Sequence, residues 1–196
     1  MTEMEKMLAG EAYDPTDPEV MARWHRAKDL VRDYNRTDSA DVREKDRILS
    51  ELLGGRGRRL WITPPFFADY GCNIHFGDNC EVNMNCTFLD DARIAIGDNA
   101  LIAPNVQIYT AFHSTCASER LGRPRPDGSF SFGKTFTAPV TIGRNVWIGG
   151  GAVILPGVTI GDDAVIGAGS VVTHDIPSGT IAYGNPCAAV RDCPRE

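Results

Sequence analysis

Histidine is the residue type most able to accept a proton at neutral pH, and this chain has four histidines. His113 ends the strand-like run NVQIYTAFHST, just before a segment that breaks the regular pattern around it. There it could act as a general base that takes the proton of an attacking hydroxyl. His25 is expected at the surface, among helix charges, and His75 is expected to be structural. Position alone does not decide between a base and an ordinary loop histidine at 113.

Bulk composition narrows the function classes. Six cysteines without CxxC spacing, in a chain of 196 residues, are expected to be reduced, mostly structural thiols of a cytoplasmic protein. The net charge of -6 argues against nucleic acid or an anionic membrane surface as a partner. No apolar run approaches the ~20 residues that span a bilayer. The first residues contain no apolar signal core, so export is not expected.

The residues up to about 60 read as a helical segment. Asp17 is a candidate N-cap, with Pro18 at the first helical position. A second helix is expected to open at Ser39 and to end at Gly54 and Gly55 with a left-handed cap. The apolar residues of the first helix recur at spacings of three and four and form one face: Val20, Trp24, Ala27, Val31 and Tyr34.

The rest of the chain follows a period of six. The same repeat runs earlier from Phe76, then slips between Ile94 and Ile96. A period of six fits neither a helix nor a flat sheet. It fits a prism of short strands and tight turns, with three sides to a coil of 18 residues and a buried aliphatic column. The clearest members of the repeat are Ile142, Ile148, Ile154, Ile160, Ile166 and Val172.

Four stretches resemble a known family: EKMLAGEAYDPTDPE, PPFFADYGCNIHFGDN, VTIGRNVWIGGGAVILPGVTIGDDAVIGAGSVVTHDIP and AYGNPC. They are similar to the maltose and galactoside O-acetyltransferases over nearly the whole chain. The resemblance implies a mainly β fold, a left-handed parallel β-helix of hexapeptide repeats. We expect a helical segment at 1–60, the β-helix at 61–185 with a protruding loop insertion at 114–139, and a C-terminal tail at 186–196. A homotrimer with active sites between neighbouring prisms is also implied.

The resemblance further implies transfer of an acetyl group from acetyl-CoA to a sugar hydroxyl (maltose-, glucose- or galactoside-like), without a metal or a covalent intermediate. His113 matches the catalytic base, and Gly150 matches a backbone N–H donor for the oxyanion. Asn83 and Asp91 match hydrogen-bond partners of the sugar. Two alternatives stay open, since Asp90 competes with Asp91, and Asn83 could simply be a corner asparagine that tolerates positive φ.

Further site positions come from the two ends of the chain. Asp17 matches an acidic position that reaches the acceptor, but Asp14 competes for that alignment and Asp17 could be only a helix cap. His174 replaces a usual lysine, and Ala188 stands where an arginine is often found. We therefore expect weaker, more pH-dependent binding of coenzyme A than is typical. The positions matching coenzyme A contacts are Gly150, Ala168, Thr173, His174 and Arg191.

The segment 114–139 abandons the six-residue period and is expected to protrude as a loop. We favour a part in acceptor selection over a mobile flap without contacts, because it starts one residue after His113. Its charged and aromatic residues are Arg120, Arg123, Arg125, Phe130, Phe132 and Phe136.

The same fold could serve three other functions. A zinc-dependent carbonic anhydrase on the same prism needs three suitably spaced nitrogen ligands, which the four histidines do not supply. A non-catalytic β-helix scaffold would not need His113, Asn83 and the VWIGG stretch together. An acetyltransferase for a non-sugar or antibiotic acceptor keeps the chemistry and changes only the acceptor.

Overall fold

Three helices come first in the computed structural model, which describes residues 1–194: α1 (Glu3–Ala9), α2 (Pro18–Arg36) and α3 (Val42–Leu52). Asp17 caps α2 as predicted, accepting hydrogen bonds from two backbone N–H groups. The next helix begins at Val42 on the cap Asp41, rather than at Ser39. None of the described helices is long and apolar enough to cross a membrane.

The left-handed cap predicted at Gly54 and Gly55 is wrong. Helix α3 ends at Leu52, and its C-cap residue Leu53 has an extended backbone conformation. Neither glycine has a positive φ. A Cβ added to Gly54 would lie 1.9 Å from the carbonyl oxygen of Cys72. Glycine is needed there because the backbone passes close to the first coil, not because the chain turns.

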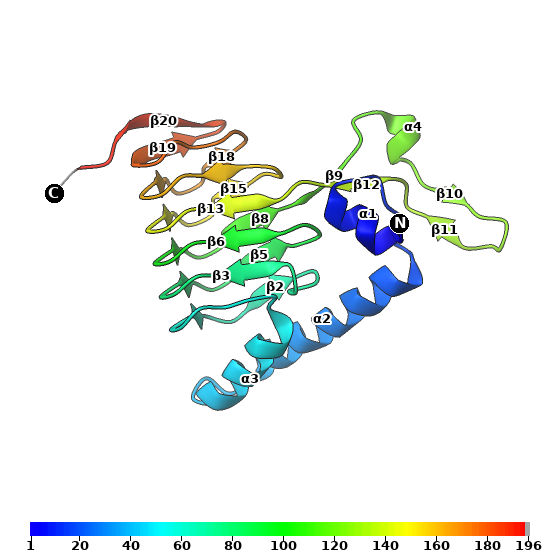
Figure 1. The fold of residues 1–196 in the computed structure, drawn as a ribbon, viewed down its shortest axis with the longest axis horizontal. Helices are drawn as coiled ribbons and strands as arrows, with labels where there is room; N and C mark the ends of the chain where they lie inside the picture. The colour runs from blue at the N-terminus through cyan, green and yellow to red at the C-terminus, as the bar shows by residue number, and fades with distance from the viewer. Residues whose placement is uncertain (195–196) are drawn as a thin grey trace.

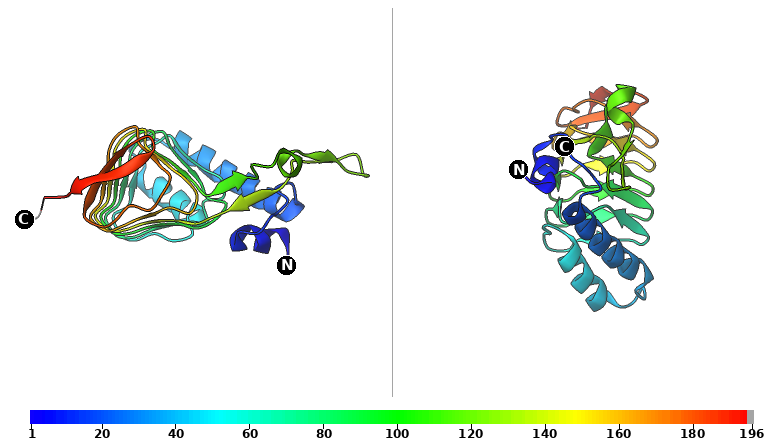
Figure 2. Two further views of the ribbon diagram at one scale, coloured as in Figure 1. Left: turned by 90° about the horizontal axis from the view of Figure 1, so that it is seen from above. Right: turned by 90° about the vertical axis from the view of Figure 1, so that its right-hand side faces the viewer.

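The chain then winds into a column of triangular coils (Figure 1; Figure 2, left). Strands of one face pair in parallel along the column, which confirms the predicted β-helix; its left-handed sense stays a prediction. Face 1 holds β1 (Trp61–Ile62), β4 (Glu81–Val82), β7 (Leu101–Ile102), β14 (Trp147–Ile148), β17 (Val165–Ile166) and β19 (Thr180–Gly184). Face 2 holds β2 (Phe66–Ala68), β5 (Cys86–Leu89), β8 (Gln107–Tyr109), β15 (Val153–Ile154) and β18 (Val171–Val172). Face 3 holds β3 (Ile74–Phe76), β6 (Ile94–Ile96), β13 (Val140–Ile142) and β16 (Thr159–Ile160).

The six-residue repeat forms the core of this column, as predicted. All six aliphatic residues from Ile142 to Val172 are at most 1% exposed. In the lower coils three phenylalanines, Phe66, Phe76 and Phe88, fill the interior, with the rings of Phe66 and Phe88 packed edge to face at 5.3 Å. The buried apolar column is the main stabilising feature of the fold, because each buried side chain contributes roughly 1.5–3 kcal/mol.

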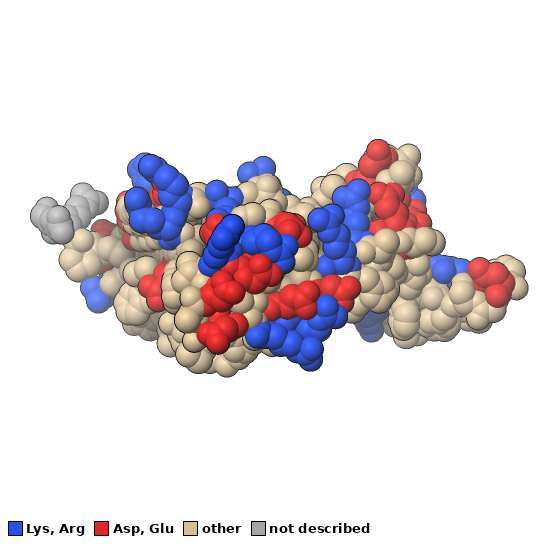
Figure 3. Space-filling model, turned by 90° about the horizontal axis from the view of Figure 1, so that it is seen from below, with Lys and Arg blue, Asp and Glu red and all other residues tan. Residues whose placement is uncertain are grey.

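Both ends of the column are covered. Helix α2 packs against the lowest coil, where the Asn35 amide donates to the Phe66 carbonyl and accepts from the Phe66 N–H, at 2.8 and 2.9 Å. Its Tyr34 hydroxyl donates to the carbonyl of Ile62. At the other end, β20 (Cys187–Asp192) pairs antiparallel with β19, within residues expected to form a tail. Of that expected tail, residues 195–196 lie outside the described residues. Seen from below, basic and acidic side chains alternate over the surface (Figure 3).

The three corners of the prism differ in regularity. Corner A joins face 1 to face 2 and consists of residues 63–65, 83–85, 103–106, 149–152 and 167–170. Corner B joins face 2 to face 3 and consists of residues 69–73, 90–93, 110–139, 155–158 and 173–175. Corner C joins face 3 to face 1 and consists of residues 77–80, 97–100, 143–146, 161–164 and 177–179. At corner C, left-handed residues stack as a ladder of amide hydrogen bonds of 2.7–2.8 Å. The ladder consists of Asn79, Asn99, Asn145 and Asp163.

Irregularity is concentrated at corner B. In the lower coils Ile74 pairs with Ile94, so one coil takes 20 residues. Higher in the column Val153 pairs with Val171, which gives the predicted coil of 18 residues. The slip in the sequence repeat is thus two extra residues between Phe88 of face 2 and Ile96 of face 3, in the strands that flank corner B. The whole loop insertion also leaves the column there, between Thr110 and Ala138, whose backbones are joined by a 2.8 Å hydrogen bond.

The buried Asp90 holds corner B of the lower coils together. Its carboxylate accepts backbone hydrogen bonds from Asp69, Tyr70 and Asn73 at 2.8–3.2 Å, and the residue is 0% exposed. Burial raises the pKa of Asp90 to about 7, against the lowering effect of these donors.

We expect Asp90→Ala to lower the free energy of unfolding by about 3 kcal/mol, because it leaves three N–H groups without their acceptor. Urea unfolding followed by circular dichroism measures this loss. The matched control is Asp29→Ala on the exposed side of α2, which should cost less than about 0.5 kcal/mol. A similar, small loss in both variants would contradict the role given to Asp90.

Candidate active site

Corner B presents His113 at the end of β9 (Ala111–His113). This strand pairs antiparallel with β12 (Thr135–Thr137), and together they carry the protruding segment away from the column (Figure 2, left). His113 is exposed, and its Nδ1 lies 3.4 Å from the carbonyl oxygen of Lys134. A carbonyl can only accept, so this contact favours the tautomer with the proton on Nδ1. The lone pair of Nε2 is then available to take a proton from a hydroxyl.

One coil below, Asp91 lies at the same corner. The Tyr13 hydroxyl donates to its Oδ1 at 2.7 Å, whereas Oδ2 is buried and has no hydrogen-bond partner within residues 1–194. Burial raises the pKa of the Asp91 carboxyl, and the Tyr13 hydrogen bond opposes that shift. Between the two sequence candidates, Asp90 is committed to the backbone of corner B. Asp91 alone retains a free acceptor oxygen.

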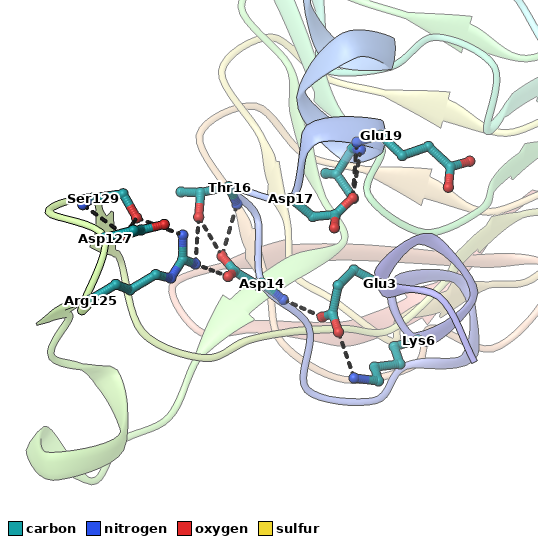
Figure 4. A network of polar contacts seen from close by, with 10 residues as sticks. Glu3, Lys6, Asp14, Thr16, Asp17, Glu19, Arg125, Asp127 and Ser129 are labelled. Carbon is teal, nitrogen blue, oxygen red and sulfur yellow. Dashed lines mark hydrogen bonds and ion pairs between the residues drawn. The ribbon is translucent and has the colours of Figure 1, made fainter.

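The link between α1 and α2, residues 10–17, is called the N-terminal arm and lies along the protruding segment. Asp14 pairs with Arg125 of that segment, and Thr16 accepts from the same guanidinium at 2.9 Å (Figure 4). Tyr13 forms a β-bridge with Thr135. The segment is therefore fixed to the arm, unlike the mobile flap without contacts.

Neither acidic candidate of the arm is free in this arrangement. Asp14 is bound to Arg125, and Asp17 accepts from the N–H groups of Glu19 and Val20 as the α2 cap (Figure 4). The structure shows Asp17 only as the N-cap of α2. Its predicted contact with the acceptor stays a prediction.

Corner A carries a second group of predicted residues. Asn83 follows β4, and its side-chain oxygen accepts from the Met84 N–H at 2.9 Å. Its φ is not positive; the left-handed residue of this turn is Asn85, so the corner explanation for Asn83 is wrong. Two coils above, Gly150 follows β14, and its N–H makes no hydrogen bond within the described residues. Ala168 is exposed one coil higher.

The remaining predicted residues lie at the upper end of the column. Thr173 and His174 belong to corner B, where the threonine hydroxyl lies 2.8 Å from Nδ1 of the exposed histidine. Arg191 is exposed on β20. No group of three or more His, Cys, Asp or Glu suited to a metal ion occurs in the part of the chain that the structure describes.

The predicted site is split across face 2. Gly151 donates to the carbonyl of Pro104, so Gly150 is level with that residue at corner A. From there the chain runs along β8 and β9 to His113 at corner B. The two strands together hold six extended residues, which cover roughly 20 Å between corner A and His113. One copy of the chain therefore does not bring the His113 imidazole to the Gly150 N–H.

The sequence does not predict two contacts of the site. Tyr13 stands in the quoted stretch EKMLAGEAYDPTDPE, but nothing local signals that its hydroxyl meets Asp91, 78 residues away. In the sequence, Arg125 is only one of several charges of the loop segment. Its partner Asp14 is 111 residues distant, so only the folded chain shows the pair.

Comparisons with known proteins agree with this architecture. The family model described as "Maltose acetyltransferase hexapeptide capping motif" matches residues 6–57, and "Bacterial transferase hexapeptide (six repeats)" matches residues 139–174. Nodulation protein L of Rhizobium meliloti is 47% identical over 190 residues, covering 97% of this chain and 98% of that protein. A crystal structure of a maltose O-acetyltransferase from Clostridium difficile 630 is 45% identical, with a TM-score of 0.90 and coverage of 100% and 99%. A galactoside acetyltransferase in complex with coenzyme A is 38% identical, with a TM-score of 0.91 and coverage of 99% and 92%.

Proposed function

This chain belongs to the hexapeptide-repeat acetyltransferases, the family of the maltose and galactoside O-acetyltransferases, and we propose that it acetylates a hydroxyl of a sugar. Acetyl-coenzyme A is the acetyl donor. The observation that carries the proposal is the pair of groups at corner B: a histidine whose Nε2 can accept a proton, and the Asp91 carboxylate, one oxygen of which has no hydrogen-bond partner within residues 1–194.

In the proposed mechanism, Nε2 of His113 takes the proton of the sugar hydroxyl as its oxygen attacks the thioester carbon. The new C–O bond gives a tetrahedral intermediate, whose oxyanion accepts a hydrogen bond from the Gly150 N–H. The C–S bond then breaks, and the departing thiolate of coenzyme A takes the proton back from His113. No metal and no covalent enzyme intermediate is needed. Asn83 and Asp91 orient the acceptor, with Asp17 near the rim.

The separation of His113 and Gly150 across face 2 supports active sites built from two copies of the chain. A cyclic assembly places corner A of each copy against corner B of the next, and three prisms close such a ring into the proposed homotrimer. Leu101 and Trp147, paired neighbours on face 1, are 48% and 53% exposed and give apolar surface for side-by-side association. The six cysteines are free thiols, which suits the proposed cytoplasmic location.

The test of the function is a panel of sugars, amino sugars, alcohols and hydroxyl-bearing antibiotics incubated with acetyl-CoA, followed by release of free thiol. Thiol release with at least one simple sugar or glycoside is the expected result. Release only with a non-sugar acceptor would replace the proposed substrate class. No release with any acceptor would favour the scaffold function.

The proposed coenzyme A site contains Ala168, Thr173, His174 and Arg191. Among these residues, His174 should make coenzyme A binding depend on pH. An exposed imidazole gains a positive charge as the pH falls, and that charge attracts the phosphates of the coenzyme. We expect the KM for acetyl-CoA to rise severalfold between pH 5.5 and pH 8, and His174→Lys to flatten this rise. A profile that is already flat in the unaltered protein would contradict the role of His174.

A further inference from the structure

A cavity of about 400 Å³ opens between α2, the end of α3 and corner B of the lowest coil, and is called the helix cavity. Both helices lie below that coil (Figure 1). The α2 residues that line the cavity, Arg23, Arg26, Ala27 and Leu30, are spaced three and four apart and share one face of the helix. The volume is in the range of small-ligand sites. No residue of the lining belongs to the proposed catalytic, acceptor or coenzyme A sites.

The floor of the helix cavity is apolar and continuous with the core of the column. Ala27 and Leu52 are 2% and 1% exposed, and the half-buried Leu30 packs against the same core. Tyr70 of corner B adds a buried aromatic ring to the lining. Because these side chains belong to packed elements, the floor is preformed. An apolar group that lies on it is removed from water, which favours binding.

The rim of the cavity carries one positive charge without a partner. Arg23 forms an ion pair with Glu19 at 3.1 Å, and Asp29 forms one with Arg32 at 2.7 Å. The two acidic residues on either side of Arg26 along α2 are therefore taken by other cations. Arg26 itself makes no ion pair within residues 1–194, although its guanidinium lines the cavity.

The other ionisable groups of the lining add no net charge. Glu51 forms an ion pair with Arg47, which lies outside the lining. Burial raises the pKa of the Cys72 thiol, the Asp90 carboxylate adds to this rise, and the two arginines of the lining oppose it. The thiol is thus uncharged at neutral pH, and it lies close enough to both guanidinium groups for their charge to act on it. Asp90 is fully buried and bound to backbone N–H groups, so it does not face a ligand.

We propose that the helix cavity binds a small monocarboxylate with an apolar body. The carboxylate pairs with Arg26, and unused N–H groups of Arg23 are further donors. The apolar body lies on the floor formed by Ala27, Leu30 and Leu52. An ion pair beside such a floor is less screened than one in open water. A dianion without an apolar part would find only one unpaired cation and would leave the floor unused, so the lining favours the monocarboxylate.

Alkylation of Cys72 reports on this cavity without any acetyl transfer. The protein is treated with iodoacetamide in the presence and absence of millimolar benzoate, and the modified peptides are quantified over time by mass spectrometry. Benzoate should slow the reaction at Cys72 by about threefold, because only the empty cavity leaves the thiol accessible. Cys116, an exposed thiol of the protruding segment, is the internal control and should react at an unchanged rate.

Three further compounds separate the effect of the charge from that of the apolar body. Acetate has the carboxylate without the ring, benzyl alcohol has the ring without the charge, and inorganic phosphate is an anion without an apolar part. Each of them should protect Cys72 much less than benzoate does. Protection by any of the three that equals the protection by benzoate would overturn the inference.

Arg26→Gln should abolish the protection by benzoate, since it removes the unpaired charge and keeps the length of a polar side chain. Arg36→Gln is the matched control, because Arg36 is exposed on the same helix and lies outside the lining. This variant should be protected like the unaltered protein. Protection that survives Arg26→Gln, or that extends equally to Cys116, would contradict the site. The result does not depend on the proposed sugar acetylation, because no turnover is measured.

Discussion

Replacing His113 with alanine should lower kcat for acetyl transfer by about 10²- to 10⁴-fold, because the attacking hydroxyl loses the base that removes its proton. The imidazole is exposed at the end of β9, and its Nδ1 lies 3.4 Å from the Lys134 carbonyl oxygen. Its removal should therefore leave the melting temperature and the oligomer unchanged. Steady-state kinetics with acetyl-CoA and a reactive sugar measure the effect.

His25→Ala serves as the matched control, since it removes an exposed histidine from α2 without touching corner B. It should retain nearly full activity. If His113→Ala keeps more than a tenth of the turnover, the base is another group and the proposed mechanism is wrong. Loss of activity accompanied by loss of the oligomer would assign His113 an architectural role instead.

Mixing two inactive variants should restore activity, which is the second large effect expected. His113→Ala disables corner B, and Gly150→Pro removes the N–H donor at corner A. The φ of Gly150 is not positive, but an added Cβ would lie 3.2 Å from the Pro104 carbonyl oxygen, so the fold of the proline variant is checked first. If each site takes one corner from each of two neighbours, random exchange of subunits gives about one quarter of the sites both intact corners. Activity should rise from near zero to about that fraction.

The measurement is thiol release after the two purified variants are unfolded and refolded together, with each variant refolded alone as the control. Asn83→Ala replaces Gly150→Pro if the proline variant does not fold, since it also alters corner A. No recovery from correctly assembled mixtures would mean that each active site lies within a single chain. That outcome would contradict active sites that combine corner A of one copy with corner B of the next.

The column could be predicted from the sequence because its period has a direct physical cause. Each short side of the prism needs one apolar residue that faces inward, such as Ile148 or Ile154. A polar residue at that position would be buried, so apolar residues recur every six positions and reveal the coils. Capping of α2 by Asp17 was equally local and therefore readable. The end of α3 was not, because Gly54 is set by its approach to Cys72 in another coil.

The candidate site could be predicted only residue by residue. His113 stood out because it ends a regular run, and Asp91 came from the family resemblance. That Asp91 keeps one oxygen while Asp90 loses both depends on which backbone groups fold over each carboxylate. The engagement of Asp14 by Arg125 joins segments far apart in the chain, and no spacing rule anticipates such a pair.

The covered ends of the column decide how copies of this protein can meet. A stack of coils is in principle endless, since the last strand of each face offers free N–H and C=O groups to the next molecule. Here Asn35 occupies both backbone groups of Phe66 at one end, and β20 lies along the edge of face 1 at the other (Figure 2, left). Growth into filaments is blocked along these edges. Contact between copies is left to the flanks of the column, where the proposed trimer would form.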